Sequence, residues 1–284
     1  MELGIAFRAQ GRFEEAISQF FEALRLKPES AEAYNNIGNV LAIQGKADEA
    51  VVYYSRALQY NPDFVETHNN IANVLKGQGK TEEAIKHYLR VLQVEPDHVQ
   101  TIQNLGRVFA EQGKLEDALN QFIEALKIEP ENADLHNYAG LVLGQQGQLS
   151  EAVNHFMEAI RINPDHFLAH KNLGVTFLRL GDINKAVEHL LKTAEIKPDD
   201  PEVHRMLGIA LENQGRFKEA ADHYREALKF EPDSAENHDN LGVALAQMGQ
   251  IEEAIKHFNK ALEIDSSFNT AREHLEIALR EMER

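Results

Sequence analysis

The chain has 284 residues, of which 43% are hydrophobic and 26% charged, as in an ordinary soluble protein with a large core. Its formal net charge of -17, without any basic tract, argues against nucleic acid or an anionic membrane surface as a partner. The absence of cysteine excludes disulfides and thiol chemistry, and the absence of a long apolar run argues against membrane insertion, so we expect a cytoplasmic protein.

One unit recurs along the whole chain with a step of 34 residues, and three residue types keep this register. The glycines are Gly11, Gly45, Gly79, Gly113, Gly147, Gly181, Gly215 and Gly249. The alanines are Ala16, Ala50, Ala84, Ala118, Ala152, Ala186, Ala220 and Ala254. The prolines are Pro28, Pro62, Pro96, Pro130, Pro164, Pro198 and Pro232, and the series ends at Ser266.

Each glycine separates two segments with a helical apolar pattern. In the stretch NNIGNVLAIQGKADEAVVYYSRALQYNP, residues 35–62, one predicted helix precedes Gly45 and another follows it. Glycine favours a left-handed helix stop, and Asp48 and Glu49 favour the start of the second helix because they complement its dipole. Pro62 then ends that helix. The unit is therefore predicted to be a helical hairpin.

The register predicts eight hairpins in chain order, followed by one more helix. We expect repeats at residues 1–30 (a truncated first repeat), 31–64, 65–98, 99–132, 133–166, 167–200, 201–234 and 235–268. Residues 269–284 are expected to form a C-terminal capping helix, since polar residues on the outward side of a terminal helix keep a solenoid end soluble.

The pattern resembles the tetratricopeptide repeat (TPR) family over essentially the whole chain. The family's signature residues at repeat positions 4, 7, 8, 11, 20, 24 and 27 are present in the eighth repeat. They are His238, Leu241, Gly242, Leu245, Ala254, Phe258 and Ala261. Departures such as Ala72 in place of glycine do not disturb the hairpin. The resemblance implies an all-α, right-handed α-solenoid of antiparallel helix hairpins, a TPR superhelix, whose first helices line a concave groove.

Asparagines are unusually frequent on the side of the first helices that the resemblance places in the groove. Position 6 carries Asn36, Asn70, Asn104, Asn172 and Asn240, and position 9 adds Asn39 and Asn73. Because an amide offers a donor and an acceptor, such a row can bind a peptide backbone whatever its side chains. It resembles the asparagine ladder of the O-linked N-acetylglucosamine transferases. The alternative is that these exposed amides are consensus residues without a ligand.

The same side changes character along the chain. Position 9 continues with Arg107 and then becomes apolar, which suggests a binding strip. The apolar members are Leu141, Val175, Ile209 and Val243. Lys171, Arg179 and Arg205 lie at groove positions where they could receive a carboxylate, or they could belong to a solvated charged face.

Thirteen histidines raise the question of a metal site. Most fall at two repeat positions, 4 and 23, and equivalent residues of neighbouring repeats are expected about 10 Å apart, the distance between packed helices. A metal needs its ligands much closer, so we expect no metal. No phosphate-binding loop, nucleophile elbow or catalytic constellation is present, so we expect neither an enzyme nor a cofactor.

The sequence thus predicts a protein–protein interaction scaffold that binds an extended peptide in its groove. Two alternatives remain open. The chain could be the substrate-recognition region of a larger enzyme such as a glycosyltransferase, or it could self-assemble into homo-oligomers through the ends of the solenoid.

Overall fold

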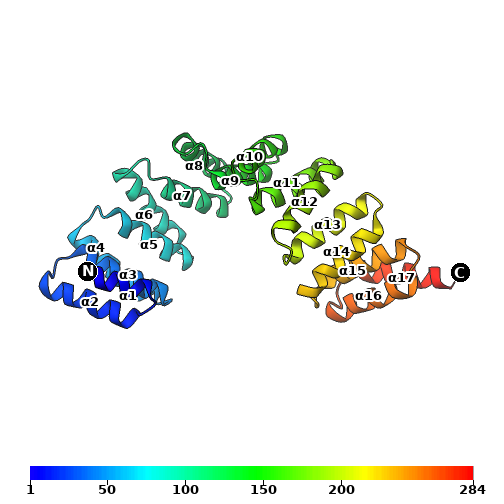
Figure 1. Cartoon of the computed structure of the whole chain (residues 1–284), viewed down its shortest axis with the longest axis horizontal. Coiled ribbons are helices and arrows are strands. Elements are labelled where there is room, and N and C mark those ends of the chain that lie inside the picture. The colour runs from blue at the N-terminus through cyan, green and yellow to red at the C-terminus, as the bar shows by residue number, and fades with distance from the viewer. Residues whose placement is uncertain (284) are drawn as a thin grey trace. The chain divides into compact units, whose positions relative to one another are not determined.

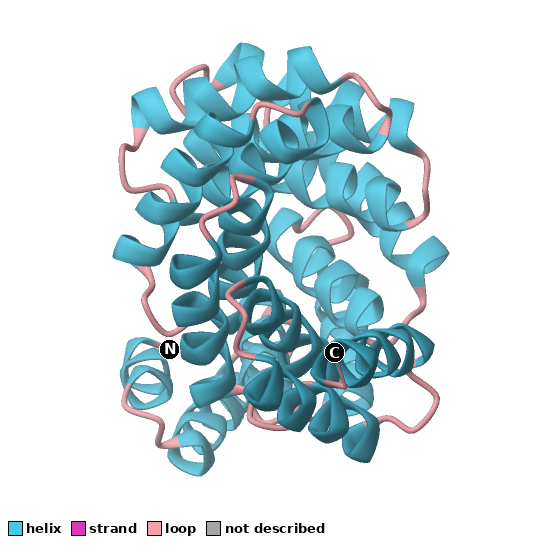
Figure 2. Cartoon of the chain, turned by 90° about the vertical axis from the view of Figure 1, so that its right-hand side faces the viewer, coloured by secondary structure: helices cyan, strands magenta, loops and turns pink. Residues whose placement is uncertain are grey.

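The computed structural model describes residues 1–283, which form 17 α-helices and no strand. Figure 2 shows these helices joined by short loops. The helices are α1 (Glu2–Ala9), α2 (Phe13–Leu26), α3 (Ala31–Ile43), α4 (Ala47–Tyr60), α5 (Val65–Gly77), α6 (Thr81–Val94), α7 (Val99–Glu111), α8 (Leu115–Ile128), α9 (Ala133–Gln145), α10 (Leu149–Ile162), α11 (Phe167–Leu180), α12 (Ile183–Ile196), α13 (Pro201–Asn213), α14 (Phe217–Phe230), α15 (Ala235–Gln247), α16 (Ile251–Ile264) and α17 (Asn269–Met282).

The chain divides into two compact units, which we describe separately. The N-terminal unit, Met1–Glu131, contains α1 to α8, and the C-terminal unit, from Asn132 onward, contains α9 to α17. In each unit the hairpins follow one another in chain order (Figure 1). The all-α hairpin architecture predicted from the 34-residue step is confirmed.

The turn inside each hairpin depends on a glycine. Gly181, after α11, has a φ of 78°, in the left-handed region, and its N–H donates to the Leu178 carbonyl. An L-residue with a side chain adopts this conformation at a cost, whereas glycine adopts it freely. All eight glycines of the 34-residue register have positive φ, as predicted.

The core of each hairpin is built where its two helices cross. Gly38 on α3 lies against the ring of Tyr54 on α4, so close that a Cβ on Gly38 would stand 2.5 Å from a ring carbon. Ala50 and Ala57 of the same hairpin are fully buried. Small residues therefore let the helices approach, and one large aromatic fills the space between them, which stabilises the hairpin by about 1.5–3 kcal/mol.

Neighbouring hairpins pack in a regular way within each unit. The second helix of one hairpin contacts the first helix of the next, as α4 contacts α5 and α14 contacts α15. First helices of successive hairpins also contact each other, as α3 does α5 and α15 does α17. Side chains on one side of the first helices are thereby brought together from repeat to repeat. Among residues 1–283, none of the helices is both long and apolar enough to span a membrane.

Candidate functional site

The predicted site residues all lie on first helices of the hairpins. We call the side formed by repeat positions 2, 5, 6, 9 and 13 of these helices the groove face. In the N-terminal unit it carries Asn36 and Asn39 on α3, Asn70 and Asn73 on α5, and Asn104 and Arg107 on α7. In the C-terminal unit it carries Leu141 on α9, Lys171, Asn172, Val175 and Arg179 on α11, Arg205 and Ile209 on α13, and Asn240 and Val243 on α15.

In the N-terminal unit the asparagines bind one another across the repeats. The Asn70 side-chain N–H₂ donates to the Oδ1 of Asn39 at 2.8 Å and to the Oδ1 of Asn35 at 3.2 Å. Asn104 makes a longer contact of the same kind, 3.4 Å, to the Oδ1 of Asn73. The side-chain donors of Asn70 and Asn104 are therefore used between hairpins, and they connect α3 to α5 and α5 to α7, whereas Asn36 donates to the Glu32 carbonyl of its own helix.

The second row of asparagines has a partner that the sequence did not reveal. The Tyr54 hydroxyl donates to the Oδ1 of Asn39 at 2.8 Å, and the Tyr88 hydroxyl donates to the Oδ1 of Asn73 at 2.6 Å. Both tyrosines are almost completely buried, and burial raises the pKa of Tyr88 to about 12. A buried hydroxyl needs an acceptor, and asparagine at position 9 supplies it.

Sequence reasoning missed a third set of asparagines, at position 5. Asn35 is buried, accepts from Asn70 and from the Thr67 hydroxyl, and donates to Glu66. In the C-terminal unit Asn137 accepts from Asn172 at 2.9 Å. The signal was available, because Asn35, Asn69 and Asn137 keep the same 34-residue register as the asparagines that follow them.

The groups of the row that can still bind a ligand are mainly side-chain oxygens, which accept hydrogen bonds. The Oδ1 atoms of Asn70 and Asn172 have no hydrogen bond within residues 1–283, and both side chains are half-buried. By contrast, the Oδ1 of Asn36 accepts from Arg8, and that of Asn104 accepts from Gln100. An amide oxygen can accept the N–H of a peptide backbone. Asn70 and Asn172 are thus the members of the row best able to bind one.

Asn240 differs from the other position-6 asparagines. Its Nδ2 is buried without a hydrogen-bond partner among the residues that the structure describes. On the same helix, Asn237 is completely buried, and both of its side-chain polar atoms lack a partner in the described part. Such groups cost free energy of folding.

In the C-terminal unit three of the four apolar members of position 9 lie over apolar partners. Phe156, Leu190 and Phe258 occupy the position held by Tyr54 and Tyr88, and none has a hydroxyl that needs an acceptor. Behind Ile209 the equivalent residue is Tyr224, whose hydroxyl donates to Glu212 at 2.9 Å instead. Leu141 is 40% exposed, and Val175, Ile209 and Val243 are half-buried. The change from amide to apolar side chains follows the core behind Leu141, Val175 and Val243, and it leaves apolar surface on the groove face.

The basic residues of the groove face already have partners. Lys171 forms an ion pair with Glu202, and Arg205 pairs with Glu236 at 2.8 Å, in each case with the next repeat. Arg179 donates to the Gly144 carbonyl at 2.9 Å. Acidic residues at position 2 of the neighbouring hairpin thus pair with Lys171 and Arg205, and the binding of a ligand carboxylate by these side chains stays a prediction.

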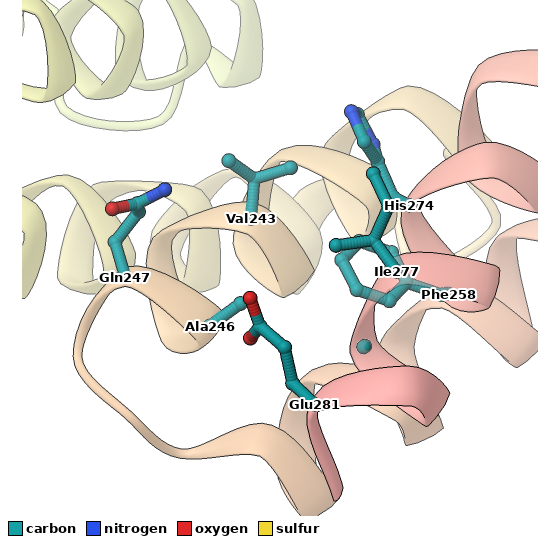
Figure 3. Close-up of a pocket in the computed structure, with 8 residues that line it drawn as sticks. Val243, Ala246, Gln247, Phe258, His274, Ile277 and Glu281 are labelled. Atoms are coloured by element: carbon teal, nitrogen blue, oxygen red, sulfur yellow. The ribbon is translucent and has the colours of Figure 1, made fainter. Parts of the chain in front are cut away.

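Two pockets lie on the groove face, one in each unit. The first, of about 300 Å³, is lined by Arg8, Asn39, Ala42, Ile43, Tyr54, Asn70, Asn73 and Val74. The second, of about 290 Å³, is lined by Val243, Ala246, Gln247, Phe258, His274, Ile277, Ala278 and Glu281 (Figure 3). Each pocket combines apolar walls with a few polar groups, as is usual where ligands bind.

The expectation that the histidines lie too far apart to share a metal ion is wrong. The histidines at positions 4 and 23 of one repeat meet where its two helices cross, with their Nδ1 atoms 2.8 to 3.1 Å apart in every such pair. The five pairs are His68–His87, His136–His155, His170–His189, His204–His223 and His238–His257.

Backbone carbonyls fix the protons of four of these pairs. The Nε2 of His204, for example, lies 2.9 Å from the Pro198 carbonyl, which can only accept. His204 therefore carries its proton on Nε2, and its Nδ1 accepts the Nδ1–H of His223. Burial lowers the pKa of His223, and a charge on His204 lowers it further. The pairs are hydrogen-bonded, and no group of three metal-ligating side chains is found within residues 1–283.

Comparison with known proteins identifies the repeat. Models described as TPR repeat match residues 106–147 and 213–249. Models described as tetratricopeptide repeat match residues 1–64, 65–98, 143–208 and 240–268. No curated protein matches the chain.

Solved structures share the fold. YrrB, described as a TPR protein with an unusual peptide-binding site, is 22% identical with a TM-score of 0.59, and the match covers 66% of this chain and 96% of YrrB. MamA is 26% identical with a TM-score of 0.53, over 57% of this chain and 95% of MamA. PilF of Pseudomonas aeruginosa is 19% identical with a TM-score of 0.64, over 74% and 96%. Since tetratricopeptide models match nearly every hairpin, this chain belongs to the tetratricopeptide repeat family.

Proposed function

We propose that this chain is a protein–protein interaction scaffold whose groove face binds an extended peptide segment of a partner. Proteins of this family are generally protein-interaction scaffolds and mostly not enzymes. The observation that carries the proposal is the unused Oδ1 of Asn70, which lies in the wall of a pocket of about 300 Å³ on the groove face of the N-terminal unit.

The hydrogen bonds inside the row support this role. Asn70 is held by two bonds to Asn35 and Asn39, so its amide is oriented before a ligand arrives. An acceptor that is already ordered costs less conformational entropy on binding. Its oxygen would take a backbone N–H of the peptide, which is a contact that does not depend on the peptide's sequence.

The C-terminal unit would add selectivity. Asn172 has an unused Oδ1 like that of Asn70, and Val175 and Ile209 expose part of their apolar side chains close to it on the groove face. A peptide that binds its backbone to Asn172 would place some of its side chains against this surface. Apolar side chains at those places are favoured because they leave water.

Peptide display followed by binding measurements tests the proposal. Peptides selected on the full chain should bind less tightly to Asn70→Ala or Asn172→Ala, by about twofold to tenfold for each lost net hydrogen bond of 0.5–1.5 kcal/mol. The matched control is Asn120→Ala, an exposed asparagine on the second helix α8. Val175→Asp should weaken the binding of only those peptides that carry apolar side chains.

The proposal fails if the Asn70 and Asn172 variants bind the selected peptides as tightly as the parent does. Far-ultraviolet circular dichroism of each variant separates loss of folding from loss of binding. Two alternatives have their own tests. A catalytic region elsewhere in the full-length gene would favour a substrate-recognition arm, and growth of the scattering mass with concentration would favour self-assembly. A cytoplasmic location, with neither nucleic acid nor cofactor as partner, remains part of the proposal.

A further inference from the structure

The pocket at the end of the C-terminal unit was not expected from the sequence. Its walls come from three helices, α15, α16 and α17. Val243, Ala246 and Gln247 lie on α15, and Phe258 on α16 forms part of the wall between α15 and α17 (Figure 3). The pocket measures about 290 Å³, which is enough room for one long side chain.

The walls are largely apolar. Phe258 and Ala278 are almost completely buried, and Val243 is half-buried. Ile277 is 53% exposed, which is unusual for a large apolar residue that faces a pocket. An aliphatic chain placed between Val243 and Ile277 would remove part of this surface from water and would be stabilised by it.

The pocket lining includes one carboxylate, that of Glu281. Figure 3 shows the Glu281 side chain reaching from α17 toward Ala246 on α15. Within residues 1–283 the Glu281 carboxylate makes neither an ion pair nor a hydrogen bond. The ring of His274, which also lines the pocket, already has a partner, because its Nδ1 is 2.9 Å from the buried carboxylate of Asp239. A ligand would therefore meet a carboxylate that has no partner in the described part of the chain.

The charges near the pocket also favour a cationic ligand. Among residues 1–283 the pocket lining holds no lysine or arginine, and Arg280, the neighbour of Glu281 on α17, pairs with Glu276. Gln247 adds an amide oxygen that can accept from a cationic group. The net charge of the whole chain, -17, attracts a basic ligand over longer distances.

We infer that this pocket binds one long basic side chain, arginine or lysine, of the partner peptide. The aliphatic stem lies between Val243 and Ile277, and the cationic head pairs with Glu281 and donates a hydrogen bond to the side-chain oxygen of Gln247. Arginine and lysine combine an apolar stem with a charged end, which matches an apolar pocket with a carboxylate. This inference rests on the proposed function, and it names one property of the partner: a basic residue near the end that reaches α17.

Side-chain analogues test the pocket without the partner. In the full chain with labelled Ile and Val methyl groups, n-butylguanidinium and n-butylammonium should shift the Val243 and Ile277 signals saturably in the millimolar range. Butyrate, which has a similar stem and the opposite charge, should not. Glu281→Gln should weaken the binding of n-butylguanidinium about twofold to fivefold, as expected for an exposed ion pair. Ile277→Ser should weaken the binding of both cationic probes.

The matched control is Glu283→Gln, which makes the same charge change on the same end of the chain outside the pocket lining. It should leave the affinity for n-butylguanidinium unchanged. The inference is overturned if butyrate binds as well as the cationic probes, or if the Glu281 and Glu283 variants behave alike. The probes do not need the rest of the groove face. A failure of peptide binding at Asn70 and Asn172 can therefore be told apart from a failure of cation binding in this pocket.

Discussion

The buried hydroxyl of Tyr54 donates a hydrogen bond to the Oδ1 of Asn39, 2.8 Å away on the other helix of the same hairpin. The same relationship joins Tyr88 to Asn73 in the next hairpin. Phe156 and Phe258 have no hydroxyl, and position 9 of their repeats is apolar, whereas the Tyr224 hydroxyl, behind Ile209, donates to Glu212 instead. Asn39 and Asn73 are thus explained by the tyrosines in the core behind them.

Asn39→Leu should therefore destabilise the N-terminal unit. The substitution leaves the Tyr54 hydroxyl buried without an acceptor, which costs about 1–3 kcal/mol. Urea unfolding, with hydrogen exchange at the amides of α3 and α4, measures the loss. Adding Tyr54→Phe should recover much of it, because the unsatisfied hydroxyl is then gone. If the double variant is as unstable as the sum of both single variants, the hydrogen bond does not explain Asn39.

Asn237→Val should stabilise the C-terminal unit. Both polar atoms of this completely buried amide lack a partner in the described part, and valine at the same repeat position is already present as Val203. Removing an unsatisfied buried amide gains about 1–3 kcal/mol. Thermal unfolding of the full chain provides the measurement.

Thr67→Val is the matched control for that change. Thr67 holds the same repeat position, is equally buried and donates to Asn35 at 3.0 Å. Its replacement should lower stability by about 0.5–1.5 kcal/mol, since a formed hydrogen bond is lost. Equal effects of both substitutions, in either direction, would show that hydrogen bonding does not decide this position.

Gly208→Ala should destabilise the hairpin of α13 and α14. The added Cβ would stand 2.4 Å from a ring carbon of Tyr224, so the helices must move apart, at a cost of about 1–3 kcal/mol. Gly77→Ala, at a site with no atom within 4 Å of the new Cβ, should instead gain up to about 1 kcal/mol. The unfolding midpoints of the two variants should therefore move in opposite directions from that of the parent.

The histidine pairs predict that stability falls in mild acid. In the folded chain, burial and the paired ring lower the pKa of His87, His155, His189, His223 and His257. The unfolded chain, with histidine pKa values of about 6.5, then binds more protons than the folded chain. The contribution of these pairs to the free energy of unfolding is therefore fully present above about pH 6.5, and it is lost as the pH falls toward the lowered pKa values.

Replacing histidines at position 23 with glutamine tests this, since glutamine can donate to the partner ring and does not titrate. Variants with one, three and five such replacements should lose the dependence of the melting temperature on pH in proportion to their number. A slope between pH 5 and 7 that does not change with the number of replacements would mean that other groups cause it.

The sequence alone determined the repeat, the hairpin and the places where helices end. These features depend on the helical period, on glycine at positive φ and on proline, and all of them act within a few residues of the chain. The 34-residue register of Gly45 and Gly79 was therefore enough to place helices that the structure confirms. The groove-face residues were likewise located on the correct helices, and their binding of a ligand stays a prediction.

The tertiary structure decided which of these residues have partners. Asn39 meets Asn70, Lys171 meets Glu202 and Arg205 meets Glu236, each pair separated by 31 residues, whereas Asn137 meets Asn172 at a separation of 35. His204 meets His223 across one hairpin at a separation of 19. No local period predicts these separations, because they depend on how far one helix is rotated and shifted against the next when the small and large core residues pack. Packing, and not the repeat pattern, therefore decided that the groove cations are neutralised and that the Oδ1 of Asn70 remains free.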